Sequence, residues 1–227
     1  MMNNILKNFF RMNLIFSGRN NKNNIKGELY KSKIKIFKKN IDNKIIIEKN
    51  AILKNCKIRI KGNNNLIIIK ENTKLVNCKL DIKEYGNKLI LEKNCSFKNL
   101  NIVFHNINSN IFINKNTTCE GMKLISTEPF DIEIGENCMF SYGIEIRNSD
   151  SHKIFSMIND KRINGGAKII IENDVWIGTR CLILKGSFIE QGSVLGAGSI
   201  VTGRVEKNSI YAGVPAKKIK SEIYWEK

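Results

Sequence analysis

The chain has 227 residues, 42% hydrophobic and 26% charged, which suits one folded domain with at most a small appendage and argues against wholesale disorder. Only two prolines and 16 glycines occur, which excludes collagen-like and proline-rich classes, and no apolar run approaches the roughly 20 residues of a membrane helix. Six cysteines without a Cys-x-x-Cys pair, and two distant histidines, argue against structural zinc, so we expect no metal.

Positive charge dominates the sequence, with 38 Lys and Arg against 21 Asp and Glu and a net charge of +17. Such an excess favours an anionic partner: nucleic acid, a membrane surface, or a phosphorylated or acidic small molecule. The abundance of Asn, Lys and Ile is also what an AT-rich genome produces, and both explanations stay open. Because no zinc-finger, helix-turn-helix or aromatic RNA-binding pattern accompanies the charge, we expect no nucleic-acid partner.

Residues 1–26 are predicted to form a basic, apolar and helical segment. Its apolar side chains lie roughly at helical spacing: Ile5, Leu6, Phe9, Phe10, Leu14 and Ile15. The segment lacks the continuous core and cleavage site of a secretory signal, so we expect a cytoplasmic protein with reduced cysteines. Two roles stay open for this segment: packing on its own or a neighbouring subunit, or peripheral contact with anionic lipid at the inner face of the membrane.

Residues 27–206 carry an internal repeat. The motif at 45–50 recurs at 67–72, 89–94 and 111–116, each 22 residues later, and then at 132–137 and 169–174. Each copy is a short β-branched run that ends in a polar turn with Asn or Asp, which tolerate left-handed backbone angles. Cys56 and Cys78 keep the same offset of 22, which indicates buried packing rather than reactivity.

A shorter period follows over residues 171–206. Every sixth residue is aliphatic, at Ile171, Ile177, Ile183, Ile189, Leu195 and Val201. The fourth residue after each of these is small or β-branched: Val175, Cys181, Ser187, Ser193, Ser199 and Val205. This spacing does not fit a helical stripe, whose period is about 3.6 residues. It suits a three-sided prism with aliphatic residues inside and small residues at the corners, so we predict an all-β solenoid in which the six hexads form two coils.

An insertion interrupts the repeat between Ile132 and Ile169, which lie 37 residues apart. Long insertions in a solenoid usually lie on one functional face, so we predict an active-site loop at about 147–166. In extended backbone, Asp150 and His152 would project to the same side. A near-neutral imidazole can take a proton from a hydroxyl, and a carboxylate can hold its tautomer. Without further support, His152 is more often an ordinary surface or core residue and Asp150 an ordinary turn residue.

The hexads resemble those of the left-handed parallel β-helix acyltransferases, the hexapeptide-repeat family. Segments 174–178, 194–202 and 212–220 carry the resemblance, which is strong over about 130–220 and weaker over 27–125. The nearest group is the sugar and polysaccharide O-acetyltransferases. The resemblance implies a left-handed β-helix, a homotrimer with each site between adjacent prisms, and direct acetyl transfer from acetyl-CoA.

The resemblance also implies roles for single residues. His152 matches the catalytic general base of the family, and Asp150 stands in the same Asp-x-His context, whereas His105 is expected to be structural or solvated. Positions that bind the acetyl donor are matched by Trp176, Thr179, Ala197, Thr202, Gly203, Lys217 and Lys220.

Several of these donor positions have a more specific implied role. Thr179 lies where a backbone amide meets the thioester oxygen, and Ala197 where the pantetheine arm passes. Gly203 replaces a family lysine, for which Arg204 could compensate. The basic tail, predicted at 207–227, provides Lys217 and Lys220 near the nucleotide phosphates. Packing in the core is the alternative for Trp176.

The sequence thus predicts an acetyl-CoA-dependent O-acetyltransferase that acts on a hydroxyl of a bacterial surface glycan: a capsule, a lipooligosaccharide or a sialic acid-containing saccharide. Two alternatives stay open: an N-acetyltransferase that acts on an amino-sugar nucleotide, and a non-catalytic β-solenoid that binds glycans or serves as a scaffold. No residue is predicted to contact the acceptor.

Overall fold

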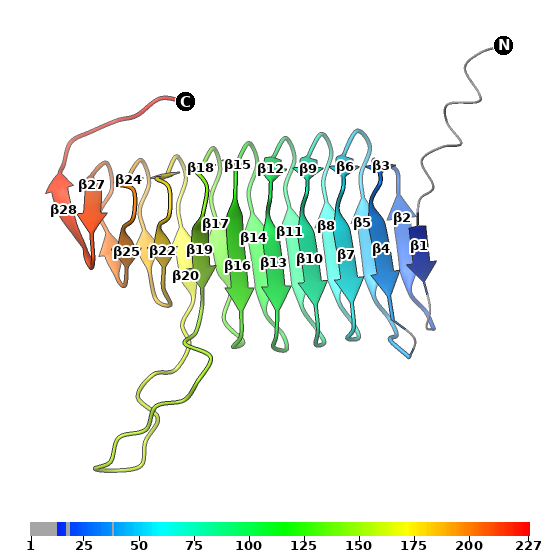
Figure 1. Ribbon diagram of the computed structural model, residues 1–227, viewed down its shortest axis with the longest axis horizontal. Coiled ribbons are helices and arrows are strands. Elements are labelled where there is room, and N and C mark those ends of the chain that lie inside the picture. Colours follow the sequence, from blue (N-terminus) through cyan, green and yellow to red (C-terminus); the bar gives the residue numbers. More distant parts are fainter. Residues whose placement is uncertain (1–12, 17–18, 38) are drawn as a thin grey trace.

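The computed structural model describes residues 13–16, 19–37 and 39–227, and this part of the chain contains strands but no helix. Within it there is accordingly no helix that could span a bilayer. The strands form three long sheets that lie around one axis, and successive strands of the chain move from one sheet to the next (Figure 1). The predicted left-handed parallel β-helix is therefore confirmed.

Each sheet takes every third strand of the chain up to β27. Sheet A contains β1 (Asn13–Phe16), β4 (Lys33–Ile36), β7 (Lys57–Ile60), β10 (Lys79–Ile82), β13 (Asn101–Phe104), β16 (Met122–Ser126), β19 (Ile144–Arg147), β22 (Leu182–Ile183) and β25 (Ile200–Val201). Sheet B contains β2 (Lys22–Ile25), β5 (Lys44–Ile47), β8 (Leu66–Ile69), β11 (Lys88–Leu91), β14 (Asn110–Ile113), β17 (Ile132–Ile134), β20 (Ile169–Ile171), β23 (Phe188–Ile189) and β26 (Arg204–Val205). Sheet C contains β3 (Glu28–Tyr30), β6 (Ile52–Lys54), β9 (Lys74–Val76), β12 (Ser96–Lys98), β15 (Thr118–Cys119), β18 (Met139–Phe140), β21 (Trp176–Ile177), β24 (Val194–Leu195), β27 (Ile210–Gly213) and β28 (Ala216–Lys220).

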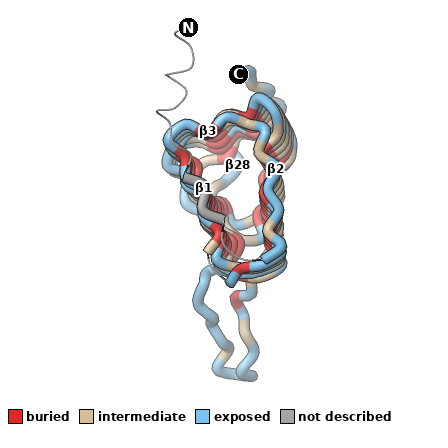
Figure 2. Tube along the Cα trace, turned by 90° about the vertical axis from the view of Figure 1, so that its right-hand side faces the viewer, coloured by how far each residue is buried: buried red, intermediate tan, exposed pale blue. Residues whose placement is uncertain are grey.

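The 22-residue repeat sets the register of the long coils. Ile45 pairs with Ile67 and Ile67 with Leu89, each 22 residues further along the chain. Because side chains alternate along a strand, residues such as Ile45 and Ile47 both face the interior, where each is fully buried. Figure 2 shows the buried positions lining the inside of the prism. Burial of each such side chain contributes about 1.5–3 kcal/mol, which makes this interior the main stabilising element of the fold.

The corner between sheets A and B is held by stacked asparagines. The side-chain oxygen of Asn43 accepts the backbone N–H of Asn65 (3.0 Å), and that of Asn65 accepts the backbone N–H of Asn87 (2.9 Å). The Asn65 amide also donates to the Glu84 carbonyl (2.8 Å). We call this stack the Asn ladder (Asn43, Asn65 and Asn87). It gives hydrogen-bond partners to backbone groups that the turn removes from the sheets.

The hexads are confirmed over most of their length and differ at the end. The aliphatic positions are buried, and Ile171 pairs with Ile189 across one 18-residue coil. Ile189, however, pairs with Val205, only 16 residues later, so Val205 occupies an aliphatic position rather than the predicted corner position. The reason is a short corner: only residues 202–203 separate β25 from β26, and the sixth hexad is incomplete.

Both ends of the solenoid differ from the predicted boundaries. Within the described part of segment 1–26, β1 and β2 are strands rather than a helix, and β1 pairs in parallel with β4. Leu14 pairs with Ile34 and Phe16 with Ile36, so the backbone is extended over these residues rather than helical. Residues 1–12 lie outside the described residues. At the other end, β27 continues sheet C past residue 206, and β28 returns antiparallel to it.

Candidate active site

The predicted active-site loop leaves the prism at the corner between sheets A and B, where β19 ends at Arg147 and β20 begins at Ile169 (Figures 1 and 2). Its two arms pair through the Ile163 N–H and the Ile154 carbonyl (2.9 Å) and through an antiparallel bridge between Phe155 and Arg162. The insertion therefore extends an ordinary corner of the coil, and the coils on either side remain stacked.

Asn148, the first residue after β19, anchors the start of this loop. Its side chain is fully buried and donates to the carbonyls of Glu128 (2.9 Å) and Phe130 (2.6 Å), while its oxygen accepts the Thr127 N–H (3.0 Å). A buried amide with all these partners fixes the direction in which the loop leaves the coil.

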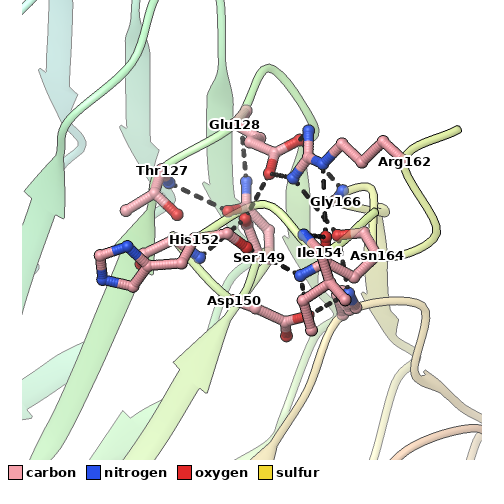
Figure 3. Close-up of polar contacts among 12 residues, drawn as sticks. Thr127, Glu128, Ser149, Asp150, His152, Ile154, Arg162, Asn164 and Gly166 are labelled. Carbon is pink, nitrogen blue, oxygen red and sulfur yellow. Dashed lines mark hydrogen bonds and ion pairs between the residues drawn. The ribbon is translucent and has the colours of Figure 1, made fainter. Parts of the chain in front are cut away.

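Glu128 fastens the two arms of the loop to the preceding coil (Figure 3). Its carboxylate forms a bidentate ion pair with Arg162 and accepts the Ser149 hydroxyl (2.5 Å) and the Gly166 N–H (3.0 Å). The hydrogen bonds from Arg162 lower the pKa of Glu128 to about 2, and Ser149 and Gly166 add to this effect. We call Glu128, Arg162, Ser149 and Gly166 the loop latch.

Asp150 lies beside the latch but does not contact the imidazole of His152. Its Oδ2 accepts Lys185 Nζ (2.5 Å) and the amide of Asn164 (2.9 Å). The same Asn164 amide donates to the backbone carbonyl of His152 (2.8 Å). The bond from Lys185 is the main cause that lowers the pKa of Asp150. Asp150 thus acts on the backbone around His152 through Asn164.

The His152 side chain is exposed on the loop. Figure 3 shows its ring turned away from the carboxylate of Asp150, and its ring nitrogens have no hydrogen-bond partner among the residues that the structure describes. An exposed imidazole with free nitrogens is able to accept a proton from a hydroxyl that approaches from outside the prism.

The predicted donor-binding residues lie in three places. Trp176 is on sheet C, 38% exposed, with its ring centroid 6.0 Å from that of Trp225, and the Trp225 indole N–H donates to the Asp174 carbonyl (2.7 Å). Lys217 and Lys220 are exposed on β28 of the same sheet.

The remaining predicted residues lie at two different corners. Thr179 and Ala197 follow β21 and β24 at the corner between sheets C and A, where the Thr179 carbonyl accepts the Gly198 N–H (2.8 Å). Thr202 and Gly203 lie between β25 and β26, at the corner that carries the loop. One chain therefore places His152 and Thr202 at one corner and Thr179 and Ala197 at another, with sheet A between them.

Arg204 is not free to take the place of the family lysine that is replaced by Gly203 in this chain. Its Nε donates to Glu190 Oε1 (2.5 Å), and Glu190 is 8% exposed. The guanidinium is thus engaged by a carboxylate of the preceding coil.

Four residues that position the loop were not predicted from the sequence: Glu128, Arg162, Asn164 and Lys185. None of them follows the 22-residue or six-residue period, so the repeat gave no signal for them. Among the described residues, no group of three or more His, Cys, Asp or Glu side chains is arranged to hold a metal ion.

Comparisons with known proteins place the fold in a family, although no protein-family model matches the sequence. The chain is 53% identical over 55 residues, 24% of its length, to a polysialic acid O-acetyltransferase of Neisseria meningitidis, and 37% identical over 101 residues, 44% of its length, to one of Escherichia coli O1:K1. These matches cover 26% and 33% of the two relatives, so the chain spans at most a third of their length in each.

A solved structure matches nearly the whole chain. The crystal structure of the polySia specific acetyltransferase NeuO superposes with a TM-score of 0.77 and 31% identity, over 95% of this chain and 89% of that one. This chain belongs to the hexapeptide-repeat acyltransferase family. In this hexapeptide-repeat acyltransferase, the buried hexads form the scaffold, and the corner loop carries the exposed His152.

Proposed function

We propose that this protein transfers an acetyl group from acetyl-CoA to a hydroxyl of an acidic bacterial surface glycan, most closely a sialic acid-containing saccharide. The observation that carries the proposal is the imidazole of His152 on a latched loop, which is exposed and has no partner within the described part of the chain. The chain also matches the polysialic acid-specific enzyme along its length. Two relatives that are named polysialic acid O-acetyltransferases support the acceptor class.

The proposed reaction needs a base for the acceptor hydroxyl and the thioester carbonyl of acetyl-CoA. A ring nitrogen of His152 takes the proton of the acceptor hydroxyl while that oxygen attacks the thioester carbonyl carbon. The resulting oxyanion is stabilised by backbone N–H donors, for which the amide near Thr179 is the candidate. The carbon–sulfur bond then breaks, the acetyl ester remains on the glycan, and the coenzyme A thiolate receives the proton from the imidazolium.

The two corners of the prism explain why we also propose a homotrimer. His152 lies at the corner between sheets A and B, while Thr179 and Ala197 lie at the corner between sheets C and A. A neighbouring copy that presents its Trp176 face and donor corner to the loop would complete the site. We further propose that the enzyme acts in the cytoplasm, where acetyl-CoA is made, and that it contacts the inner face of the membrane peripherally.

Asp150 is proposed as a positioning residue rather than a direct partner of the imidazole. It holds Asn164, which binds the His152 carbonyl, and Lys185 neutralises its charge. Asp150→Asn should therefore lower kcat less than the loss of His152 does.

The test is acceptor-dependent release of coenzyme A by His152→Ala. We expect the rates of coenzyme A release and of glycan acetylation to fall at least about 100-fold, since general-base catalysis contributes that much or more. Mass spectrometry of oligosialic acid measures the acetylation. Asn159→Ala, an exposed change at the tip of the same loop, is the matched control and should stay within about twofold. Undiminished turnover in His152→Ala would contradict the role of His152. A set of acceptors that includes an amino-sugar nucleotide shows whether the acetyl group goes to oxygen or to nitrogen.

A further inference from the structure

Sheet A of the long coils carries a column of lysines that have no acidic partner. Lys33 lies directly beside Lys57, and Lys57 beside Lys79, on adjacent parallel strands. Neighbouring strands are about 4.8 Å apart, and like charges placed side by side are destabilising. None of these three ammonium groups forms an ion pair with a residue that the structure describes.

At several other positions the same repeat pairs a lysine with a glutamate one coil further on. Lys70 contacts Glu92 at 2.6 Å, Lys98 contacts Glu120 at 3.0 Å, and Lys115 contacts Glu136 at 3.0 Å. The column itself returns to this arrangement at Lys123, whose ammonium lies 3.2 Å from Glu145. Lysines without an ion pair also lie on the other sheets, as where Lys22 lies beside Lys44 on sheet B. On sheet A, however, the stacked lysines extend over three successive coils and border a cleft.

A cleft lies over this stretch of sheet A. Its charged lining comes from Lys57, Arg59, Lys79, Asp81 and Lys83, and Asn101 and His105 add polar groups. Asp81, the one acidic residue in the lining, is 7% exposed, and its Oδ2 binds Arg59 (2.5 Å). Lys83 Nζ lies 3.3 Å from His105 Nε2, which adds a further polar group at the edge. The cleft therefore presents several cationic donors to a ligand and almost no accessible negative charge.

We infer that this cleft is a second glycan-binding site, which holds carboxylate groups of the acceptor chain at a distance from the residue that is acetylated. The inference rests on the proposed function for the identity of its ligand. The cations recur once per coil along the axis of the prism, so a linear chain with a carboxylate on each residue is able to contact several of them at once. The two apolar residues of the lining are Leu80, which is buried, and Val103, which is half-buried. Neither is an exposed side chain of the kind that inserts into lipid, which favours a saccharide over a membrane surface.

The test compares two triple variants of the full-length protein. The cleft variant is Lys57→Gln/Lys79→Gln/Lys83→Gln, and the control is Lys54→Gln/Lys74→Gln/Lys93→Gln, which removes the same charge from exposed lysines on or beside sheet C. Thermal unfolding should show the cleft variant to be at least as stable as the wild type, because its stacked lysines repel one another.

Binding is measured without acetyl-CoA, with oligosialic acid of about ten residues as probe, neutral dextran as the uncharged control, and phosphatidylglycerol vesicles as the membrane probe. The cleft variant should bind oligosialic acid about tenfold more weakly, if each of three exposed charge contacts contributes a factor of two to three. The control variant should bind within about twofold of the wild type. Equal binding by the two variants, or vesicle binding that requires the cleft while oligosialic acid binding does not, would overturn the inference.

Kinetics separate this inference from the proposed function. With long oligosialic acid the cleft variant should show KM raised about tenfold with kcat unchanged, and with a disaccharide acceptor both constants should match the wild type. An active wild type whose cleft variant keeps the same KM for long and short acceptors overturns the second site and leaves the proposed function standing. An inactive wild type whose saccharide binding still depends on the cleft overturns the proposed function and leaves the site standing.

Discussion

The long coils of the amino-terminal half and the short coils of the carboxyl-terminal half form their corners differently. The long coils carry extra residues at the corner between sheets A and B and hold them with the Asn ladder. The short coils use a single hydroxyl, as where the Ser187 Oγ donates to the Leu184 carbonyl (2.6 Å). The comparison shows that extra corner residues need internal hydrogen-bond partners. The active-site loop does not recur from coil to coil, so it is held by the loop latch instead of by a ladder.

Asn65→Ala should have the largest effect on stability. It removes the partners of the Asn87 N–H and the Glu84 carbonyl inside the corner, so we expect unfolding to become easier by about 2–4 kcal/mol. The matched change in a short coil, Ser187→Ala, should cost about 1 kcal/mol or less, because the Leu184 and Val201 carbonyls keep backbone donors. Urea denaturation measures both, and equal losses would show that the two kinds of corner do not differ.

Glu128→Gln should have an intermediate effect that is confined to the loop. The pair with Arg162 is partly shielded from solvent, with 18% and 25% of the two side chains exposed, so its loss should cost about 1–2 kcal/mol. We expect faster proteolysis within 150–166, which is followed by mass spectrometry, and a lower kcat because His152 is less well positioned.

The same variant gives a test against pH. Because folding lowers the pKa of Glu128 to about 2, its contribution is complete near neutral pH and is lost as the pH falls through the acidic range towards that value. The difference in unfolding free energy between wild type and Glu128→Gln should therefore shrink on acidification. A difference that stays constant down to pH 3 would mean that the carboxylate is not held in this way.

Trp225→Phe should have the smallest effect, below about 1 kcal/mol, since it removes one hydrogen bond to the Asp174 carbonyl at the surface. The chain has only two tryptophans, so the emission of the variant comes from Trp176 alone. We expect acrylamide to quench Trp176 more efficiently once the indole of Trp225 no longer covers it. Unchanged quenching would show that the two rings do not pack together in solution.

Much of the fold could be predicted because the repeat fixes the register. A constant offset of 22 residues places Ile45, Ile67 and Leu89 on neighbouring strands, and the structure pairs them so. The Asn ladder follows the same offset, from Asn43 to Asn65 to Asn87, a signal that was present in the sequence and not used.

The candidate site was less accessible to prediction. Glu128 and Arg162 lie 34 residues apart with no period between them, and their meeting depends on how an irregular loop folds back on its coil. Asp150 was predicted beside His152 from their spacing in extended backbone, but the turn at Ser151, with φ of 69°, directs the two side chains apart. The sequence pattern predicts a helix where strand β1 lies, because four residues are too few to separate a period of two from one of 3.6.

The final strand bears on how such a protein stays in solution. A stack of parallel strands has no natural last member, since its terminal edge offers unpaired N–H and C=O groups to any strand that arrives. Here β28 pairs antiparallel with β27 and forms the edge of sheet C, and its sequence Ala-Lys-Lys-Ile-Lys puts charge on that edge, which disfavours the addition of a further strand. This hairpin works against end-to-end growth of molecules into fibres, so that its removal would favour aggregation even if every coil beneath it remained intact.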